Sequence, residues 1–352
     1  IIIFLFLFSA PYIQSQVIPS DISGVVLWLR SDSLEVIDDK VSRIYDLSGG
    51  GYDAEQTLES KRPTYVSTTN SIFNGQPYMY FNGTSRLLGG VISGIDTSSF
   101  SLFIVSGNNA ISGWYGLFTV NNYINGITLS RSPQGYLAYY SNSSVAMSAN
   151  DIMSNSGVPL AYYSLQKEKG VIFNGFFNGI LEVTSANSTI VGTFTNSNYK
   201  LGYDETGFSD WQGNVAEVIM YNRTLSEAER LSIESYIRYR YSPPVSLSSD
   251  IYIPYGFRDT SLIAFKPWFT DYQWSTGETD SIIHVNHNGA YSVTVTDIFG
   301  FTSSDAITVT YPDYQINITD TTLCLGDSIV IKTKLDNTED YTFLWSTGET
   351  SD

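Results

Sequence analysis

The sequence has very little cysteine and histidine. Cys324 is its only cysteine, and its two histidines, His284 and His287, lie near the end of the chain. Residues 1–283 therefore lack imidazole and thiol groups, which excludes Ser-His-Asp and Cys-His catalysis there, as well as zinc sites built on those ligands. We interpret His284 and His287 as solvated residues at a strand end and a turn. A metal shared by the two is the alternative.

Positive charge is also scarce. Lys and Arg number 18 against 35 Asp and Glu, so the net charge is −17, and only 15% of the residues are charged. Because the sequence has no cluster of cations to contact phosphates, nucleic acid and anionic lipid are poor partners, and we expect no nucleic-acid binding. Aromatic residues reach 14%, and together with many Asn, Ser, Thr and Gly they are typical of secreted β proteins with polar faces.

Long apolar runs are missing, with one short exception. Residues 1–8 are all apolar, and a polar stretch marked by Pro11 follows them. A membrane-spanning helix needs about 20 apolar residues, so we expect no transmembrane segment in the mature chain. The run instead predicts a signal peptide over residues 1–16 whose basic start is missing; a buried or amphipathic first strand is the alternative. We therefore expect a secreted or extracellular protein, or one displayed on the cell surface.

Most of the chain consists of short alternating apolar segments. They predict strands at residues 100–105, 136–140, 171–173 and 215–221. Asn-Gly pairs predict tight hairpins at 74–75, 82–83, 174–175 and 178–179. One segment predicts a helix, because Ser226 and Glu229 form a capping box and Ile233, Tyr236 and Ile237 share an apolar face. We expect this helix to pack on the rim of a β-sandwich.

A nine-residue string is repeated near the end of the sequence. Tyr-Gln-Trp-Ser-Thr-Gly-Glu-Thr-Asp at 272–280 returns as Phe-Leu-Trp-Ser-Thr-Gly-Glu-Thr-Ser at 343–351, about 70 residues later. This predicts tandem small β modules that act as a stalk, in an array longer than this sequence. Pro243 and Pro244 mark a boundary, since neither continues a helix or enters a central strand. The expected domains are 17–242, 243–311 and a truncated 312–352.

Several phrases, in order, resemble the laminin G-like branch of the concanavalin A-like lectin/glucanase superfamily, as found in exported bacterial surface proteins. They are Gly-Val-Val-Leu-Trp-Leu-Arg at 24–30, Tyr-Asp-Leu-Ser-Gly-Gly-Gly-Tyr-Asp-Ala at 45–54, Arg-Pro at 62–63, Asn-Gly-Gln-Pro at 74–77, Tyr-Phe-Asn-Gly at 80–83 and Gly-Asn-Val-Ala-Glu-Val-Ile-Met-Tyr-Asn-Arg-Thr-Leu-Ser at 213–226. The resemblance covers roughly residues 20 to 241 and implies an all-β jelly roll of two packed antiparallel sheets. It implies far less about activity.

The repeated segments resemble the Ig-like or PKD-like modules of proteins exported by the type IX route. The phrases are Trp-Ser-Thr-Gly-Glu-Thr and Gly-Ala-Tyr-Ser-Val-Thr-Val-Thr-Asp at 289–297. They imply a small sandwich of the seven-strand type. Such modules often carry a cysteine pair, which the first copy replaces by Gly256 and Phe301, whereas Cys324 keeps the pattern. We expect the partner of Cys324 about 70 residues after Phe301, past the end of this sequence.

The catalytic pattern of jelly-roll glycosidases is missing. These enzymes place acids as Glu-x-Asp-x-x-Glu on a strand, because alternate residues face one cleft. The only Glu-x-Asp is Glu278-Thr-Asp280, which lies in a repeat turn and has Ile283 in place of the last acid. We therefore expect a non-catalytic protein. Asp204, Glu205 and Asp210 remain candidates for an acid/base pair, with solvated loop acids as the alternative.

Two sets of residues are candidates for binding. Asp46, Asp53 and Asn82 offer the hard oxygen ligands that calcium takes, although Asx residues beside glycine also simply shape turns. Glycan binding needs exposed rings beside hydrogen-bonding groups, and the candidates are Trp114 and Tyr115 in a glycine-flanked loop, followed by Tyr139 and Tyr140. Alternatively, Trp114 closes the sandwich edge. We expect Trp28 and Trp211 in the core.

The sequence thus predicts a secreted or cell-surface protein that binds a carbohydrate or glycoprotein surface by adhesion and displays this domain on Ig-like repeats. One alternative is an accessory binding module of a polysaccharide-degrading enzyme whose catalytic domain lies outside this sequence. Another is a structural spacer without a ligand.

Overall fold

The computed structural model describes residues 16–67, 72–95, 99–108, 115–121, 126–131, 137–141, 144–147, 158–168, 173–185, 196–203, 209–254, 259–311, 322–330 and 342–350. The chain divides into two units. Unit 1 comprises Ile1–Pro243 with Asp297–Phe301, and unit 2 comprises Pro244–Thr296 with Thr302–Asp352.

Unit 1 is an all-β body, and α1 (Glu227–Tyr241) is the only α-helix in its described part. Its strands form one 17-stranded network. They are β1 (Val25–Ile37), β2 (Lys40–Asp46), β3 (Ala54–Glu55), β4 (Thr64–Val66), β5 (Tyr78–Asn82), β6 (Leu87–Ser93), β7 (Phe100–Asn108), β8 (Tyr115–Val120), β9 (Ile127–Arg131), β10 (Leu137–Ser141), β11 (Ser144–Met147), β12 (Val158–Lys167), β13 (Phe173–Phe177), β14 (Ile180–Ser185), β15 (Asn196–Leu201), β16 (Ser209–Asp210) and β17 (Gln212–Tyr221). Two 3-10 turns, Pro19–Asp21 and Glu59–Lys61, complete the described helices.

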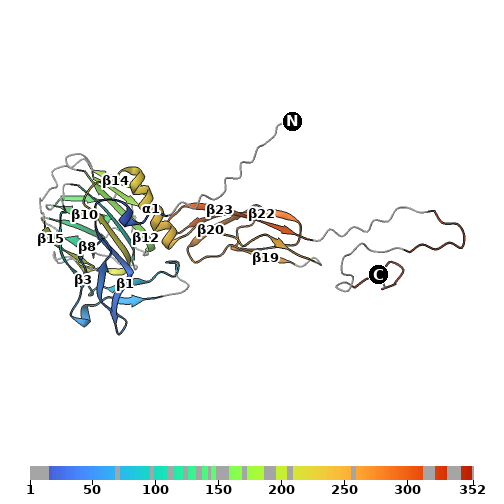
Figure 1. Cartoon of the computed structure of the whole chain (residues 1–352), viewed down its shortest axis with the longest axis horizontal. Helices are drawn as coiled ribbons and strands as arrows, with labels where there is room; N and C mark the ends of the chain where they lie inside the picture. The colour runs from blue at the N-terminus through green and yellow to red at the C-terminus, as the bar shows by residue number, and fades with distance from the viewer. Residues whose placement is uncertain are drawn as a thin grey trace, which may run out of the picture. The chain divides into compact units, whose positions relative to one another are not determined.

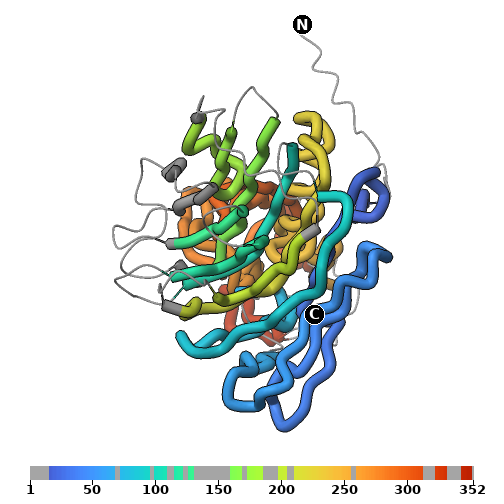
Figure 2. The backbone as a smooth tube through the Cα atoms, turned by 90° about the vertical axis from the view of Figure 1, so that its left-hand side faces the viewer, coloured from blue at the N-terminus to red at the C-terminus, as the bar shows by residue number. Residues whose placement is uncertain are grey.

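Strand pairing arranges most of this network in two rows. Row A runs β1-β17-β7-β12-β13-β14, and row B runs β3-β6-β15-β8-β9-β10-β11, with antiparallel neighbours throughout. β2 pairs with β1, β3 and β4, while β5 pairs with β4 and β17, so these strands connect the rows. The blue strands β1 to β5 lie side by side in Figure 2.

The main core fills the space between the two rows. Row A contributes Leu29, Ile104 and Val218, and row B contributes Phe118 and Leu201, all fully buried. Because side chains alternate along a strand, the neighbouring residues of row A point to its other face. There they form a second apolar cluster with α1, which includes Trp28, Phe103, Tyr162, Ile219, Ile233, Tyr236 and Ile237.

Helix α1 lies against the outer face of row A (Figure 1). The predicted capping box is present: Glu229 N–H donates to Ser226 Oγ, and Ser226 N–H donates to Glu229 Oε2. The prediction that the helix packs on the rim is wrong. The reason is that β1, β7, β12 and β17 carry apolar residues on both faces, so their outer face also needs a cover.

The Asn-Gly pairs differ in their roles. Asn74-Gly75 and Asn178-Gly179 have positive φ at both residues, as tight turns require, and Gly83 is also positive. The turn predicted at 174–175 is wrong, because these residues lie inside β13 and the following Asn178-Gly179 makes the turn to β14. Of the predicted strands, Tyr136, Val171 and Ile172 lie outside the described residues.

Unit 2 holds two sheets in its described part. A four-stranded sheet runs β18-β23-β22-β20, and a two-stranded sheet pairs β19 with β21, which differs from the predicted seven strands. The strands are β18 (Ile251–Tyr252), β19 (Thr260–Ile263), β20 (Phe269–Trp274), β21 (Ile282–Val285), β22 (Gly289–Asp297) and β23 (Thr302–Thr310). Trp274 is buried with Leu262, Ile283, Val293 and Ile307.

In the described part of the chain, no helix has the length and apolar character to cross a membrane. Cys324 is exposed there and has a free thiol.

Candidate functional site on the outer face of row B

Strand register places polar residues together on the face of row B that points away from the core. Asp210 of β16 is opposite Gly116 of β8, and Gly116 is opposite Ser130 of β9. Lys200 of β15 is opposite Thr119, which is opposite Thr128. The residues between them, Phe118, Leu129 and Leu201 among them, belong to the core. We call Lys200, Thr119, Thr128, Ser130 and Asp210 the polar face.

Three hydroxyls of the polar face are fully buried. Thr119 Oγ1 donates to the Tyr203 carbonyl at 3.2 Å. Thr128 Oγ1 and Ser130 Oγ have no hydrogen-bond partner among the described residues, although both residues are 0% exposed. A buried hydroxyl without a partner costs about 1–3 kcal/mol. These two groups therefore have unused hydrogen-bonding capacity in the closed structure.

Arg86 lies at the margin of the polar face. Its guanidinium carbon is 3.9 Å from the centroid of the Tyr203 ring, and its Nη2 is 3.4 Å from Asp210 Oδ2. Its backbone is fixed, because Arg86 N–H donates to the Lys61 carbonyl and Gln56 Nε2 donates to the Arg86 carbonyl. Arg86 Nε is buried without a partner among the described residues. A flat cation stacked on a ring beside a carboxylate is thus held in place.

Asp210 is nearly buried, and burial raises the pKa of its carboxyl, opposed by the charges of Arg86 and Lys61. Asp210 is one of the three acids that the sequence offered as an acid/base pair. The other two, Asp204 and Glu205, lie outside the described residues. Its position follows from the short parallel pairing of β16 with β8, which brings the 209–210 segment beside Tyr115 and Gly116.

The predicted aromatic residues are placed differently. Tyr115 is the first residue of β8, half-buried and packed against the core, so its assignment to a loop is wrong. Tyr115 pairs with Ser209 of β16, and this short parallel pairing includes the first residue of β8. Trp114 lies outside the described residues. In β10, Tyr139 is opposite Leu129 of the core and Tyr140 is opposite Thr128 of the polar face; the side chains of both lie outside the described part.

The three candidate calcium ligands are engaged in shaping turns. Asp46 Oδ1 accepts from the backbone N–H of Trp28 and Ser48, and Oδ2 accepts from Ser48 Oγ and Tyr52 N–H. Asp53 Oδ1 accepts from Asp46 N–H. Asn82 Oδ1 accepts from the backbone N–H and hydroxyl groups of the next turn's residues, Thr84 and Ser85. No group of three or more His, Cys, Asp or Glu among the described residues is placed to hold a metal ion.

These contacts make a prediction for Asp46. Replacing it by alanine removes the acceptor of four hydrogen bonds and is expected to lower the free energy of unfolding by about 2 kcal/mol, measured by urea denaturation. Asp46→Asn, which keeps one carbonyl oxygen, should lose less. A melting temperature of the unmodified chain that rises with added calcium and falls with chelator would contradict a role confined to the turn.

Sequence reasoning missed Arg86, Tyr203, Thr128 and Ser130. The last two belong to an alternating strand pattern, in which a polar outer face is ordinary. Only the burial of their hydroxyls distinguishes them, and that needs the register of three strands.

No family model matches the chain, and no curated protein matches it. Solved structures similar to it include domain 4 of an extracellular arabinanase from Geobacillus stearothermophilus in complex with arabinotriose, at 15% identity, 61% coverage of this chain, 98% of that chain and a TM-score of 0.44. Another is the binding domain of Paraclostridial Mosquitocidal Protein 1, at 13% identity, 79% and 76% coverage and a TM-score of 0.46. A third is Trypanosoma rangeli sialidase, at 13% identity, 63% and 34% coverage and a TM-score of 0.43. With TM-scores below 0.5, none of them assigns a function to this chain.

Proposed function

We propose that unit 1 is a carbohydrate-binding module of a secreted or cell-surface protein, and that the polar face is its binding site. The observation that carries this proposal is the pair of buried, unpartnered hydroxyls of Thr128 and Ser130. Both residues are 0% exposed, so in this proposal the polar face opens when the ligand binds. Saccharides present many hydroxyls that both donate and accept, so they match such groups, and Tyr203 and Arg86 supply a flat margin for the sugar ring.

The architecture supports a finer assignment. Two antiparallel rows packed across one core agree with a laminin G-like jelly roll, and the repeated turn of unit 2 agrees with Ig-like modules that display it. In this proposal the protein acts by adhesion to a glycan or glycoprotein, without catalysis. Export by the type IX route is part of the same proposal and rests on the resemblance of the repeats.

The test uses the whole chain on a glycan array, followed by titration calorimetry with the best ligand. The double variant Thr128→Val with Ser130→Ala is expected to weaken binding about 10-fold or more, since each lost hydrogen bond contributes about 0.5–1.5 kcal/mol. Its stability without ligand should stay unchanged or rise, because the removed hydroxyls have no partners among the described residues. If Thr128 and Ser130 only stabilised the fold, the double variant would instead be less stable.

The matched control is Thr184→Val, which removes an exposed hydroxyl from β14 of row A that bonds Asn174 Oδ1. It should leave binding unchanged. Absence of binding to every glycan and matrix glycoprotein, or equal binding by the double variant, would overturn the proposal. Release of reducing sugar from a bound polysaccharide would contradict its non-catalytic part.

A further inference from the structure

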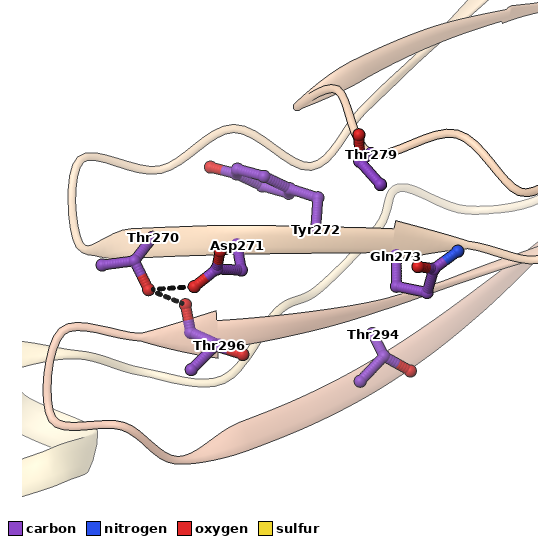
Figure 3. Close-up of a pocket in the computed structure, with 7 residues that line it drawn as sticks. All are labelled: Thr270, Asp271, Tyr272, Gln273, Thr279, Thr294 and Thr296. Atoms are coloured by element: carbon purple, nitrogen blue, oxygen red, sulfur yellow. Dashed lines mark hydrogen bonds between the residues drawn. The ribbon is translucent and has the colours of Figure 1, made fainter.

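Unit 2 has a polar recess of its own. It has a volume of about 440 Å³ and lies over β20, β22 and the turn that follows β20 (Figure 3). Its lining consists of Thr270, Asp271, Tyr272, Gln273, Thr279, Thr294 and Thr296. Figure 3 shows Thr270, Asp271 and Thr296 together at one end, Gln273 above Thr294 at the other, and the Tyr272 ring on the opposite side of β20 from Thr270.

Part of this lining is already hydrogen-bonded. The Thr270 hydroxyl lies within hydrogen-bond distance of Asp271 Oδ2 at 2.9 Å and of the Thr296 carbonyl at 3.2 Å. Thr294 Oγ1 bonds Ser304 Oγ at 2.7 Å. No hydrogen bond of the Thr279 and Thr296 hydroxyls is seen among the described residues, and Gln273, which is exposed like Thr279, donates through Nε2 to the Trp274 carbonyl. Donors and acceptors thus remain available in the recess.

The chemistry of the lining favours an uncharged ligand. Asp271 is the only charged residue in it, and no cation is present to bind a carboxylate, sulfate or phosphate. Tyr272 is half-buried, and burial raises the pKa of its phenol, opposed by a hydrogen bond with the Lys266 backbone, so this residue adds no charge to the recess. Hydroxyls and an amide are the groups that recognise the hydroxyls of a neutral sugar.

Comparing the two copies of the repeat shows which residues the turn needs and which residues belong only to the recess. In both copies the tryptophan N–H donates to the carbonyl of the glutamate four residues on, and the glycine N–H donates back to the tryptophan carbonyl. The distances are 2.9 and 3.0 Å in the first copy and 2.9 Å for both bonds in the second. The four residues before the tryptophan differ completely: Thr-Asp-Tyr-Gln at 270–273 becomes Tyr-Thr-Phe-Leu at 341–344. The repeated turn therefore does not dictate the polar lining.

We infer that this recess is a second saccharide-binding site, for a neutral sugar residue of a glycan chain, built by the first repeat and separate from the polar face of unit 1. It adds a binding site in a region otherwise interpreted as a spacer. The inference does not require the polar face to bind, because every residue that carries it belongs to unit 2.

The test exchanges the lining for that of the second copy. The variant T270Y/D271T/Y272F/Q273L carries residues that the chain itself places before the same turn, and it is made in the whole chain. The probes are neutral oligosaccharides of glucose, mannose, xylose and arabinose, with polygalacturonate as the anionic comparison. The readouts are the Kd from calorimetry and the hydrogen exchange of a peptide covering 269–274.

The experiment is run in the background T128V/S130A, which removes the polar-face hydroxyls. We expect a neutral oligosaccharide to slow hydrogen exchange in the 269–274 peptide. The four substitutions in the lining should weaken binding of that oligosaccharide at least 10-fold without lowering the melting temperature. Thr308→Val, on β23 outside the recess, is the matched control and should bind normally. Unchanged binding after the lining is exchanged, no protection of 269–274 by any neutral sugar, or a preference for polygalacturonate would overturn the inference. If the sugar binds the unmodified chain but not the T128V/S130A background, the polar face is the binding site and the inference about the recess is rejected.

Discussion

Replacing Glu217 by alanine is expected to lower the free energy of unfolding by about 3–5 kcal/mol. The Glu217 carboxylate is fully buried between β17 and α1. Oε1 accepts from Trp28 Nε1 at 2.6 Å and from the Tyr236 hydroxyl at 2.9 Å, and Oε2 accepts from the Tyr241 hydroxyl at 2.9 Å. Alanine leaves these three buried donors without an acceptor and opens a cavity.

Glutamine is the matched control for this substitution. Its carbonyl oxygen still accepts from two donors, and the Tyr241 hydroxyl can turn to accept from the new amide. Arg240, whose Nε is 3.8 Å from Oε2, loses its charge partner here but keeps Asp32 at 2.7 Å. Urea denaturation should therefore show Glu217→Gln well above Glu217→Ala in stability. Equal losses for the two variants, or a loss below about 1 kcal/mol for alanine, would contradict the assigned role.

The same residue gives the unfolding free energy a dependence on pH. Burial raises the pKa of Glu217 above its ordinary value of 4.5, opposed by its hydrogen bond from Trp28 and the charge of Arg240. The folded state therefore binds the proton more tightly than the unfolded state. The stabilisation that comes from protonating Glu217 is fully present below the pKa of this residue in the unfolded chain, and it is lost as pH rises through its pKa in the folded chain. The stability of the unmodified chain minus that of Glu217→Gln should accordingly fall as pH rises above about 4.5.

The sequence predicts the local elements of unit 1 well where one residue pattern decides them. Ser226 and Glu229 lie three residues apart and form the predicted cap, and the alternating segment at 215–221 forms part of β17. Trp28 and Trp211 are buried, as predicted. The cap and the strand depend on a short spacing and a period, which a single sequence displays directly, whereas the burial of the two tryptophans is expected from the phrases that carry the family resemblance.

Features that depend on contacts between distant segments are not visible in the sequence, whereas the failed turn at 174–175 is a local error between two neighbouring Asn-Gly pairs. Glu217 interrupts an apolar strand, and its partner Trp28 lies 189 residues away. The position of α1 on a face of row A could not be predicted for the same reason. The second apolar face of β1, β7 and β12 is recognisable only once the strands are paired. The candidate site follows this rule: Asp210 reaches Arg86 and the polar face through a two-residue parallel ladder that no local pattern indicates.

Replacing Gly89 by alanine is expected to lower the free energy of unfolding by about 3 kcal/mol, although glycine is usually the weaker residue in a strand. A Cβ at Gly89 lies 2.0 Å from the Tyr199 ring, far inside contact distance. Tyr199 is 0% exposed and is fixed by its hydroxyl, which donates to the Tyr52 carbonyl. The register between β6 and β15 shifts at this position, so the glycine lets the ring pack against the backbone of β6.

The adjacent Gly90 is the matched control, since a Cβ there meets nothing within 4 Å. Gly90→Ala should leave stability unchanged or raise it by about 0.5 kcal/mol, because alanine restricts the unfolded chain more than glycine. A double-mutant cycle with Tyr199→Ala then isolates the clash. Tyr199→Ala alone is destabilising, but adding Gly89→Ala to it should cost little, which gives a coupling of about 2–3 kcal/mol in urea denaturation. Additive losses would show that the ring is not what excludes a side chain at residue 89.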